Sequence, residues 1–136
     1  MNDREITKEL EVIEAASRDN PTAVTESDFN LAMQFIDSEN NAQKREASRV
    51  VGNGAAAFPE KLDEVIPKLL KNTKNTGTVV RWSAAYALGR IVALPEYANS
   101  DLFDTVTKLA AAETDNGIKN QYLAGLKKAE KQRNNE

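Results

Sequence analysis

The amino-acid sequence predicts an all-α protein built from a repeated pair of helices. Apolar residues recur at three- and four-residue spacing along most of the 136-residue chain, which is typical of amphipathic helices. No segment shows the strict alternation of apolar and polar residues that is expected of a half-buried strand. A similar pattern also returns every 37–38 residues, and periods of this length indicate stacked helical repeats.

Seven helices are predicted, and most are bounded by prolines, glycines or polar turns. They span residues 3–17, 25–37, 41–58, 59–73, 78–93, 101–112 and 118–131. Thr25 or Ser27 is expected to cap the second helix, because a hydroxyl oxygen there accepts from a free backbone N–H. Pro59 is placed at the start of the fourth helix, where its missing N–H has no intrahelical partner.

The composition excludes several kinds of site. The chain has no cysteine, so disulfides, thiolate zinc sites and cysteine nucleophiles are excluded, and it has no histidine, the commonest general base and metal ligand. The carboxylate pairs Asp63-Glu64 and Asp101/Asp104 are placed near helix starts, where acids stabilise the helix dipole. We therefore predict no catalytic residue, no metal and no cofactor, and we expect a protein that is not an enzyme.

The charge pattern bears on the partner and on the location. The net charge is −3, and residues 1–37 carry nine Asp and Glu against three Lys and Arg. A net acidic chain argues against non-specific binding to nucleic acid. No apolar run approaches the roughly 20 residues of a membrane span, and the charged N-terminus is unlike a secretory signal. A cytoplasmic location without membrane contact is expected.

The internal repeat is the most informative feature of the sequence. A shift of 37 residues places 44–54 on 81–91, with Gly52 on Gly89. A further shift of 38 extends the pattern into residues 118–129. Within the middle unit, five apolar residues fall on one helical stripe and are predicted to be core: Val80, Ala84, Ala87, Leu88 and Ile91.

Residues 66–91, "IPKLLKNTKNTGTVVRWSAAYALGRI", resemble a HEAT repeat of the short bacterial and archaeal type. The resemblance rests on Pro67 and a leucine pair in the first helix, then on Val80-Arg81 and an Ala-Ala…Ala-Leu-Gly series in the second. Members of that family usually carry an aspartate in the turn, tied to the arginine of the neighbouring unit. Here Asn72 or Asn75 stands in the turn, and Arg81 is expected to bond the neighbouring turn rather than a ligand.

The resemblance implies an α-α superhelix of the armadillo type, a solenoid of about three helical pairs. The pairs are expected at residues 25–58, 59–94 and 99–131. Residues 1–20 would form an N-terminal capping helix, because the end of a solenoid needs a polar outer face. Residues 132–136 would be a frayed tail.

A second stripe on the helix 78–93 carries the candidate site. Trp82, Tyr86 and Arg90 are spaced by four residues and are rotated away from the core stripe. One interpretation is that the aromatic pair packs against an adjoining helix; the other is that it lies on the concave surface that stacked second helices create. In the second case the repeat adds five side chains to the surface: Arg45, Arg49, Asn53, Asn120 and Lys128.

The resemblance implies a non-enzymatic adaptor that binds a protein or an acidic peptide segment on this surface, since HEAT-type proteins mostly act as adaptors. One alternative is an accessory or regulatory subunit of a larger enzyme or signalling assembly. Another is an enzyme on the same scaffold. The HEAT-like di-iron hydroxylases need histidines, and this chain has none. The DNA-glycosylase relatives are longer and strongly basic, whereas this chain is short and net acidic, so binding to nucleic acid is not expected either.

Overall fold

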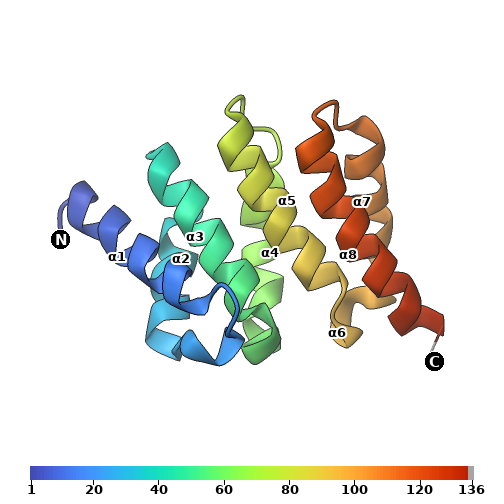
Figure 1. Ribbon diagram of the computed structural model, residues 1–136, viewed down its shortest axis with the longest axis horizontal. Helices are drawn as coiled ribbons and strands as arrows, with labels where there is room; N and C mark the ends of the chain where they lie inside the picture. Colours follow the sequence, from blue (N-terminus) through green and yellow to red (C-terminus); the bar gives the residue numbers. More distant parts are fainter. Residues whose placement is uncertain (135–136) are drawn as a thin grey trace.

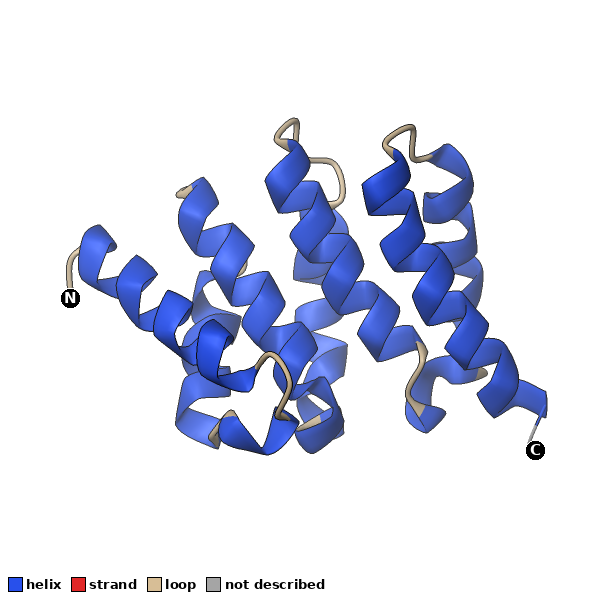
Figure 2. Ribbon diagram, in the orientation of Figure 1, coloured by secondary structure: helices blue, strands red, loops and turns tan. Residues whose placement is uncertain are grey.

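The computed structural model describes residues 1–134, and all regular structure in that range is helical (Figure 2). The α-helices are α1 (Asp3–Ser17), α2 (Glu26–Phe35), α3 (Asn41–Gly54), α4 (Leu62–Asn72), α5 (Thr78–Val92), α6 (Pro95–Ala98), α7 (Asp101–Ala112) and α8 (Asn116–Asn134). Short 3-10 turns at Pro21–Ala23, Ala55–Ala57 and Pro59–Lys61 connect some of them.

The helices form two layers (Figure 1). α2, α4 and α7 lie in the rear layer, and each packs against the helix that follows it in the front layer, α3, α5 or α8. α1 continues the front layer beside α3, so the order across that layer is α1, α3, α5, α8. We call this front layer the second-helix layer. The prediction of an all-α solenoid with about three helical pairs and an extra N-terminal helix is confirmed.

The N-terminal helix α1 follows the same period as the repeats. The four helices of the second-helix layer begin at Asp3, Asn41, Thr78 and Asn116, so their starts are spaced by 38, 37 and 38 residues. α1 buries Ile6, Leu10 and Ile13 on its inner side, and most of its other side chains are exposed and polar. α1 therefore covers α3 as a terminal cap would.

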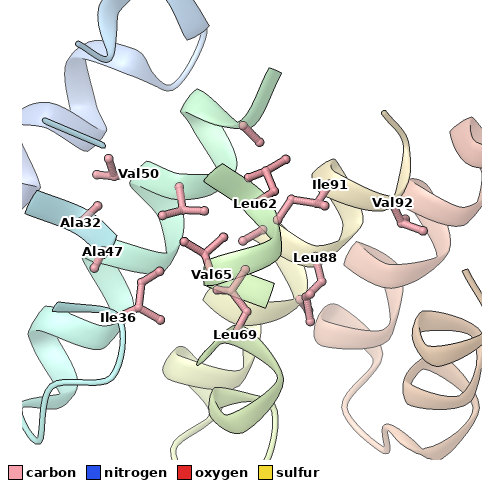
Figure 3. Packing of buried hydrophobic residues seen from close by; sticks show 14 of the residues in the cluster. Ala32, Ile36, Ala47, Val50, Leu62, Val65, Leu69, Leu88, Ile91 and Val92 are labelled. Atoms are coloured by element: carbon pink, nitrogen blue, oxygen red, sulfur yellow. The ribbon is translucent and has the colours of Figure 1, made fainter. Parts of the chain in front are cut away.

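One continuous apolar core lies between the layers (Figure 3). α4 contributes Leu62, Val65 and Leu69, all fully buried, and these meet fully buried residues of α3 and α5. The predicted core stripe of α5 is confirmed, because its five residues are at most 3% exposed. Alanines on α5 let its neighbours approach closely, while the leucine and isoleucine fill the remaining space.

The third predicted helix is shorter than expected. α3 ends at Gly54 rather than at residue 58, and a 3-10 turn follows it. Pro59 explains the break, because proline disfavours helical geometry in the preceding residue, and Phe58 accordingly has φ −132° and ψ 54°. Pro59 begins a second 3-10 turn, so the α-helical hydrogen bonding of α4 starts only at Leu62. Thr25, one of the two expected caps, closes a capping box at α2.

The C-terminal part differs from the prediction at two places. Residues 95–98, expected to be loop, form the short helix α6. The ring of Pro95 at its first position fixes φ near the value of an α-helix, which favours a helix start there. α8 continues to Asn134, three residues beyond the expected end at 131. Arg133 holds this last turn: its Nη1 donates to the Ala98 oxygen at 3.3 Å, and its guanidinium lies 4.1 Å from the Phe103 ring centroid. Of the expected frayed tail, residues 135–136 lie outside the described residues.

Polar side chains in the turns tie successive pairs together. Arg81 donates to the oxygens of Asn75 and Thr76 at 3.2 Å, and it forms an ion pair with Glu113 of the next pair at 3.2 Å. Asn72 reaches back and donates to the Ile36 oxygen at 2.9 Å. The expectation that Arg81 bonds the neighbouring turns is confirmed. Asn72 and Asn75 are uncharged, so the carboxylate that pairs with Arg81 comes from Glu113 instead of from the turn before α5.

Candidate functional site

The second-helix layer carries all eight residues of the predicted binding surface. Arg45, Arg49 and Asn53 belong to α3, and Asn120 and Lys128 belong to α8. The other three, Trp82, Tyr86 and Arg90, belong to α5, which lies between them. Their burial differs widely, from the buried Asn53 to the exposed Arg90, Asn120 and Lys128.

Four of these side chains form a continuous row. The rings of Trp82 and Tyr86 are stacked, with centroids 5.4 Å apart. The Arg49 guanidinium lies 4.9 Å from the Trp82 ring centroid, and the Arg90 guanidinium lies 4.4 Å from the Tyr86 ring centroid. Such cation–π contacts restrict both partners. We call Arg49, Trp82, Tyr86 and Arg90 the aromatic–arginine row. Both aromatic rings are half-buried and Arg90 is exposed.

Arg49 is held at one end of the row by α5. Its Nε donates to the Ser83 hydroxyl oxygen at 3.0 Å, and that hydroxyl donates to the Val79 oxygen at 2.9 Å. The buried carboxylate of Glu46 lies 4.0 Å from Arg49 Nη1 and 2.7 Å from Arg45 Nε. Arg45 is therefore paired along α3, while Arg49 is directed toward Trp82.

Asn53 is not the open surface residue that the repeat alignment implied. It is 2% exposed, and its amide nitrogen donates to Glu14 Oε2 at 3.1 Å and to the Ser17 hydroxyl at 3.2 Å. The Tyr86 hydroxyl donates to the Asn53 amide oxygen. The expected exposure of Asn53 is wrong because α1 covers this part of α3. Asn53 instead fixes the position of Tyr86.

The helix α1 adds a buried carboxylate beside the row. Glu14 is 3% exposed and forms an ion pair with Arg18 at 2.5 Å. The hydrogen bond from Arg18 holds the pKa of the Glu14 carboxyl below its usual value, although burial acts in the opposite direction. Burial raises the pKa of the Tyr86 hydroxyl. Tyr86 is therefore protonated at neutral pH, and its hydroxyl donates a hydrogen bond to the Asn53 amide oxygen.

Replacing Asn53 with alanine is expected to lower the free energy of unfolding by about 2 kcal/mol. The change leaves the Tyr86 hydroxyl without its acceptor and removes one of the donors to the Glu14 carboxylate, which keeps its ion pair with Arg18. Leaving a buried polar group unsatisfied costs about 1–3 kcal/mol. Urea unfolding followed by circular dichroism measures the difference. Asn120→Ala is the matched control, because Asn120 is exposed, and we expect it to change stability by less than about 0.5 kcal/mol. Equal losses in the two variants would contradict the buried network.

Three hollows adjoin the aromatic–arginine row. One of about 300 Å³ lies toward α1 and is lined by Glu14, Arg18 and the first three members of the row. A second of about 220 Å³ lies toward the start of α8, with Val79, Trp82 and Ile118 in its wall. A third, also about 220 Å³, lies between α3, α5 and α8 and is lined in part by Tyr86, Arg90 and Lys128.

The structure thus joins some of the predicted residues and separates others. Arg90 and Lys128, from α5 and α8, line the same hollow. Arg45 is partly exposed toward Glu11 of α1, 4.0 Å away. Asn120 is exposed on α8 and lines none of the three hollows just described. The face therefore centres on Trp82 and Tyr86, with one open side toward α1 and another toward α8.

Comparison with known proteins agrees with this architecture. A family model described as "Tubulin-specific chaperone D-like, ARM repeats" matches residues 14–127. The chain belongs to this armadillo-repeat family. No match to a curated protein or to a solved structure was found. The expected relationship to the HEAT and armadillo repeats is confirmed, and the match extends from the end of α1 into α8.

Four residues that adjoin the aromatic–arginine row were not predicted from the sequence: Glu14, Arg18, Val79 and Ser83. Glu14 belongs to α1 and Arg18 follows its last residue, and this helix was expected only to cap the solenoid. The signal was present, because the start of α1 precedes that of α3 by one repeat period. Val79 is 48% exposed and stands one residue before the core stripe.

Among residues 1–134, no helix has the length and apolar character of a membrane span.

Proposed function

We propose that this armadillo-repeat chain is a non-catalytic scaffold module that holds a segment of a partner protein on the concave side of its second-helix layer. The observation that carries the proposal is the aromatic–arginine row, a half-buried Trp–Tyr pair with an arginine at each end. Tryptophan, tyrosine and arginine are the side chains that most often dominate binding energy at protein interfaces.

The row is preorganised for binding. Arg49 is fixed by Ser83 and by the Trp82 ring, and Tyr86 is fixed by Asn53. Side chains that are already ordered lose less conformational entropy when a partner binds, so more of the contact energy appears as affinity. Trp82 adjoins two of the three hollows, which gives a partner's side chains places to enter on either side of the ring.

The proposed partner is a protein segment with acidic character. Arginines lie at both ends of the row, and guanidinium groups pair well with carboxylates. The matched family is named after a chaperone that is specific for tubulin, and a scaffold that grips another protein is in keeping with that name. A net charge of −3 disfavours nucleic acid as the partner.

Replacing Trp82 with alanine is expected to weaken partner binding by about 2 kcal/mol, or roughly thirtyfold, while the protein stays folded. The partner is first captured from native lysate with the wild-type chain and identified by mass spectrometry. Its affinity for both proteins is then measured by calorimetry, and thermal melts of both proteins are recorded beside the binding curves.

Val12→Ala is the control for this experiment. Val12 is a 58% exposed apolar side chain on α1 that lines none of the three hollows, so its removal should leave binding unchanged. Reversing Arg90 to glutamate should weaken binding and reduce its dependence on salt, because a screened attraction is lost. If Trp82→Ala strongly lowers the melting temperature while the protein that remains folded binds normally, the row is part of the core and the proposed site is wrong.

A further inference from the structure

The hollow between α3, α5 and α8 differs from the other two hollows in its charge. Arg90 and Lys128 stand in its wall, and no aspartate or glutamate is among the described residues that line it. Both cations are exposed, and neither forms an ion pair within residues 1–134. By contrast, Arg18, Arg45, Arg49 and Arg81 each have a carboxylate within 4.0 Å.

Two unpaired cations from neighbouring helices are suited to one acidic group. The rest of the wall is uncharged: it consists of small and apolar residues with Tyr86 and the side-chain amides of Asn53 and Gln121, so Arg90 and Lys128 are the only charged side chains among the described residues that line it. A hollow of about 220 Å³ is large enough for a carboxylate with its first methylene groups. A carboxylate there would accept charge-assisted hydrogen bonds from both cations.

We infer that this hollow is the subsite for a carboxylate of the partner segment, a side-chain or C-terminal carboxylate. This inference rests on the proposed function, because it adds a second contact to the one at Trp82. Eight residues separate Trp82 from Arg90 along α5, which is about 12 Å at the rise of an α-helix. An extended peptide covers that distance in about four residues.

The recognised segment is therefore an extended peptide with two features. An apolar side chain rests on Trp82 and Val79, where the second hollow opens. A carboxylate, about four residues along the peptide, lies between Arg90 and Lys128. Tyr86 stands between the two contacts, since it stacks on Trp82 and also lines the hollow with Arg90.

Selection from a displayed library of random 12-residue peptides tests the inference with the intact chain. Wild-type protein is the immobilised target, and the Trp82→Ala protein is added in solution as a competitor, so that only Trp82-dependent peptides are kept. We expect these peptides to be enriched in aspartate or glutamate about four residues from an apolar residue. Synthetic versions are then titrated by fluorescence anisotropy.

The decisive comparison uses the double variant Arg90→Gln/Lys128→Gln. We expect it to bind the selected peptides at least about tenfold more weakly, the change that corresponds to losing charge-assisted hydrogen bonds. The matched control is Lys127→Gln/Lys131→Gln, which removes two exposed lysines of α8 that do not line the hollow, and its affinity should not change. Peptides with Glu→Gln, and peptides with an amidated C-terminus, show which carboxylate is bound.

The outcomes separate this inference from the proposed function. If Trp82-dependent peptides are obtained but lack acidic residues and bind the double variant normally, the carboxylate subsite is wrong and the Trp82 site stands. If no Trp82-dependent peptide is obtained, both fail. Arg90 also lies in the last turn of α5, where a cation is favourable for the helix dipole. A double variant that melts earlier but binds normally would assign Arg90 that structural role alone and would overturn the subsite.

Discussion

Replacing Leu88 with alanine is expected to lower the free energy of unfolding by about 2–5 kcal/mol, the range for truncating a fully buried leucine. Leu88 is 0% exposed and belongs to the same buried cluster as Val65, Leu69 and Ile91 (Figure 3). Because the cluster joins α4 to α5, the cavity would lie between the two layers of one helical pair. Interiors are densely packed and relax only partly around such a loss.

Urea unfolding monitored by circular dichroism measures this change, with the m-value checked for an unaltered unfolding transition. Val79→Ala is the control on the same helix, since Val79 is 48% exposed and its truncation should cost less than about 1 kcal/mol. A loss below 1 kcal/mol for Leu88→Ala would show that the register of α5 is wrong. The assignment of Trp82 to the opposite stripe would then be wrong as well.

The architecture was predictable because its main determinants are local. The spacing of small and apolar residues on α5 identified a buried stripe, and the 37–38 residue period identified the stacking. The boundaries near Phe58 and at α6 were less predictable. At both places a proline follows a helix, and whether a 3-10 turn, a loop or a short α-helix forms depends on the packing of the next element.

The candidate site was only partly predictable, because burial across helices is a tertiary property. The four-residue spacing of Trp82, Tyr86 and Arg90 correctly placed them on one face of α5. The repeat alignment predicted that Asn53 is exposed like them. In the structure α1 covers Asn53, and the Asn53 amide nitrogen donates to the Glu14 carboxylate of α1. The spacing of residues within one helix cannot predict that a residue 39 positions earlier in the chain, here Glu14, will cover a side chain of that helix.

α5 and α8 approach each other closely in the second-helix layer, and this approach depends on two glycines. An added Cβ at Gly125 would overlap the carbonyl group and Cα of Gly89, and a Cβ at Gly89 would lie 2.6 Å from the Gln121 oxygen. These neighbours are backbone atoms, so they cannot move aside as a flexible side chain would. The alignment of Gly52 with Gly89 along the repeat follows the same logic, since a Cβ at Gly52 would lie 3.0 Å from the Ala87 Cα.

Replacing Gly125 with valine is therefore expected to lower the free energy of unfolding by about 3 kcal/mol. Overpacking a close contact costs about 1–3 kcal/mol and occasionally more, whereas valine gains only a few tenths of a kcal/mol over glycine in helix propensity. Ala124→Val is the matched control, because it adds two methyl groups at the adjacent, exposed position of α8. Urea unfolding of both variants gives the difference. If the two variants lose the same small amount, α5 and α8 do not meet at these glycines, and the hollow that Arg90 and Lys128 share would not have the walls described.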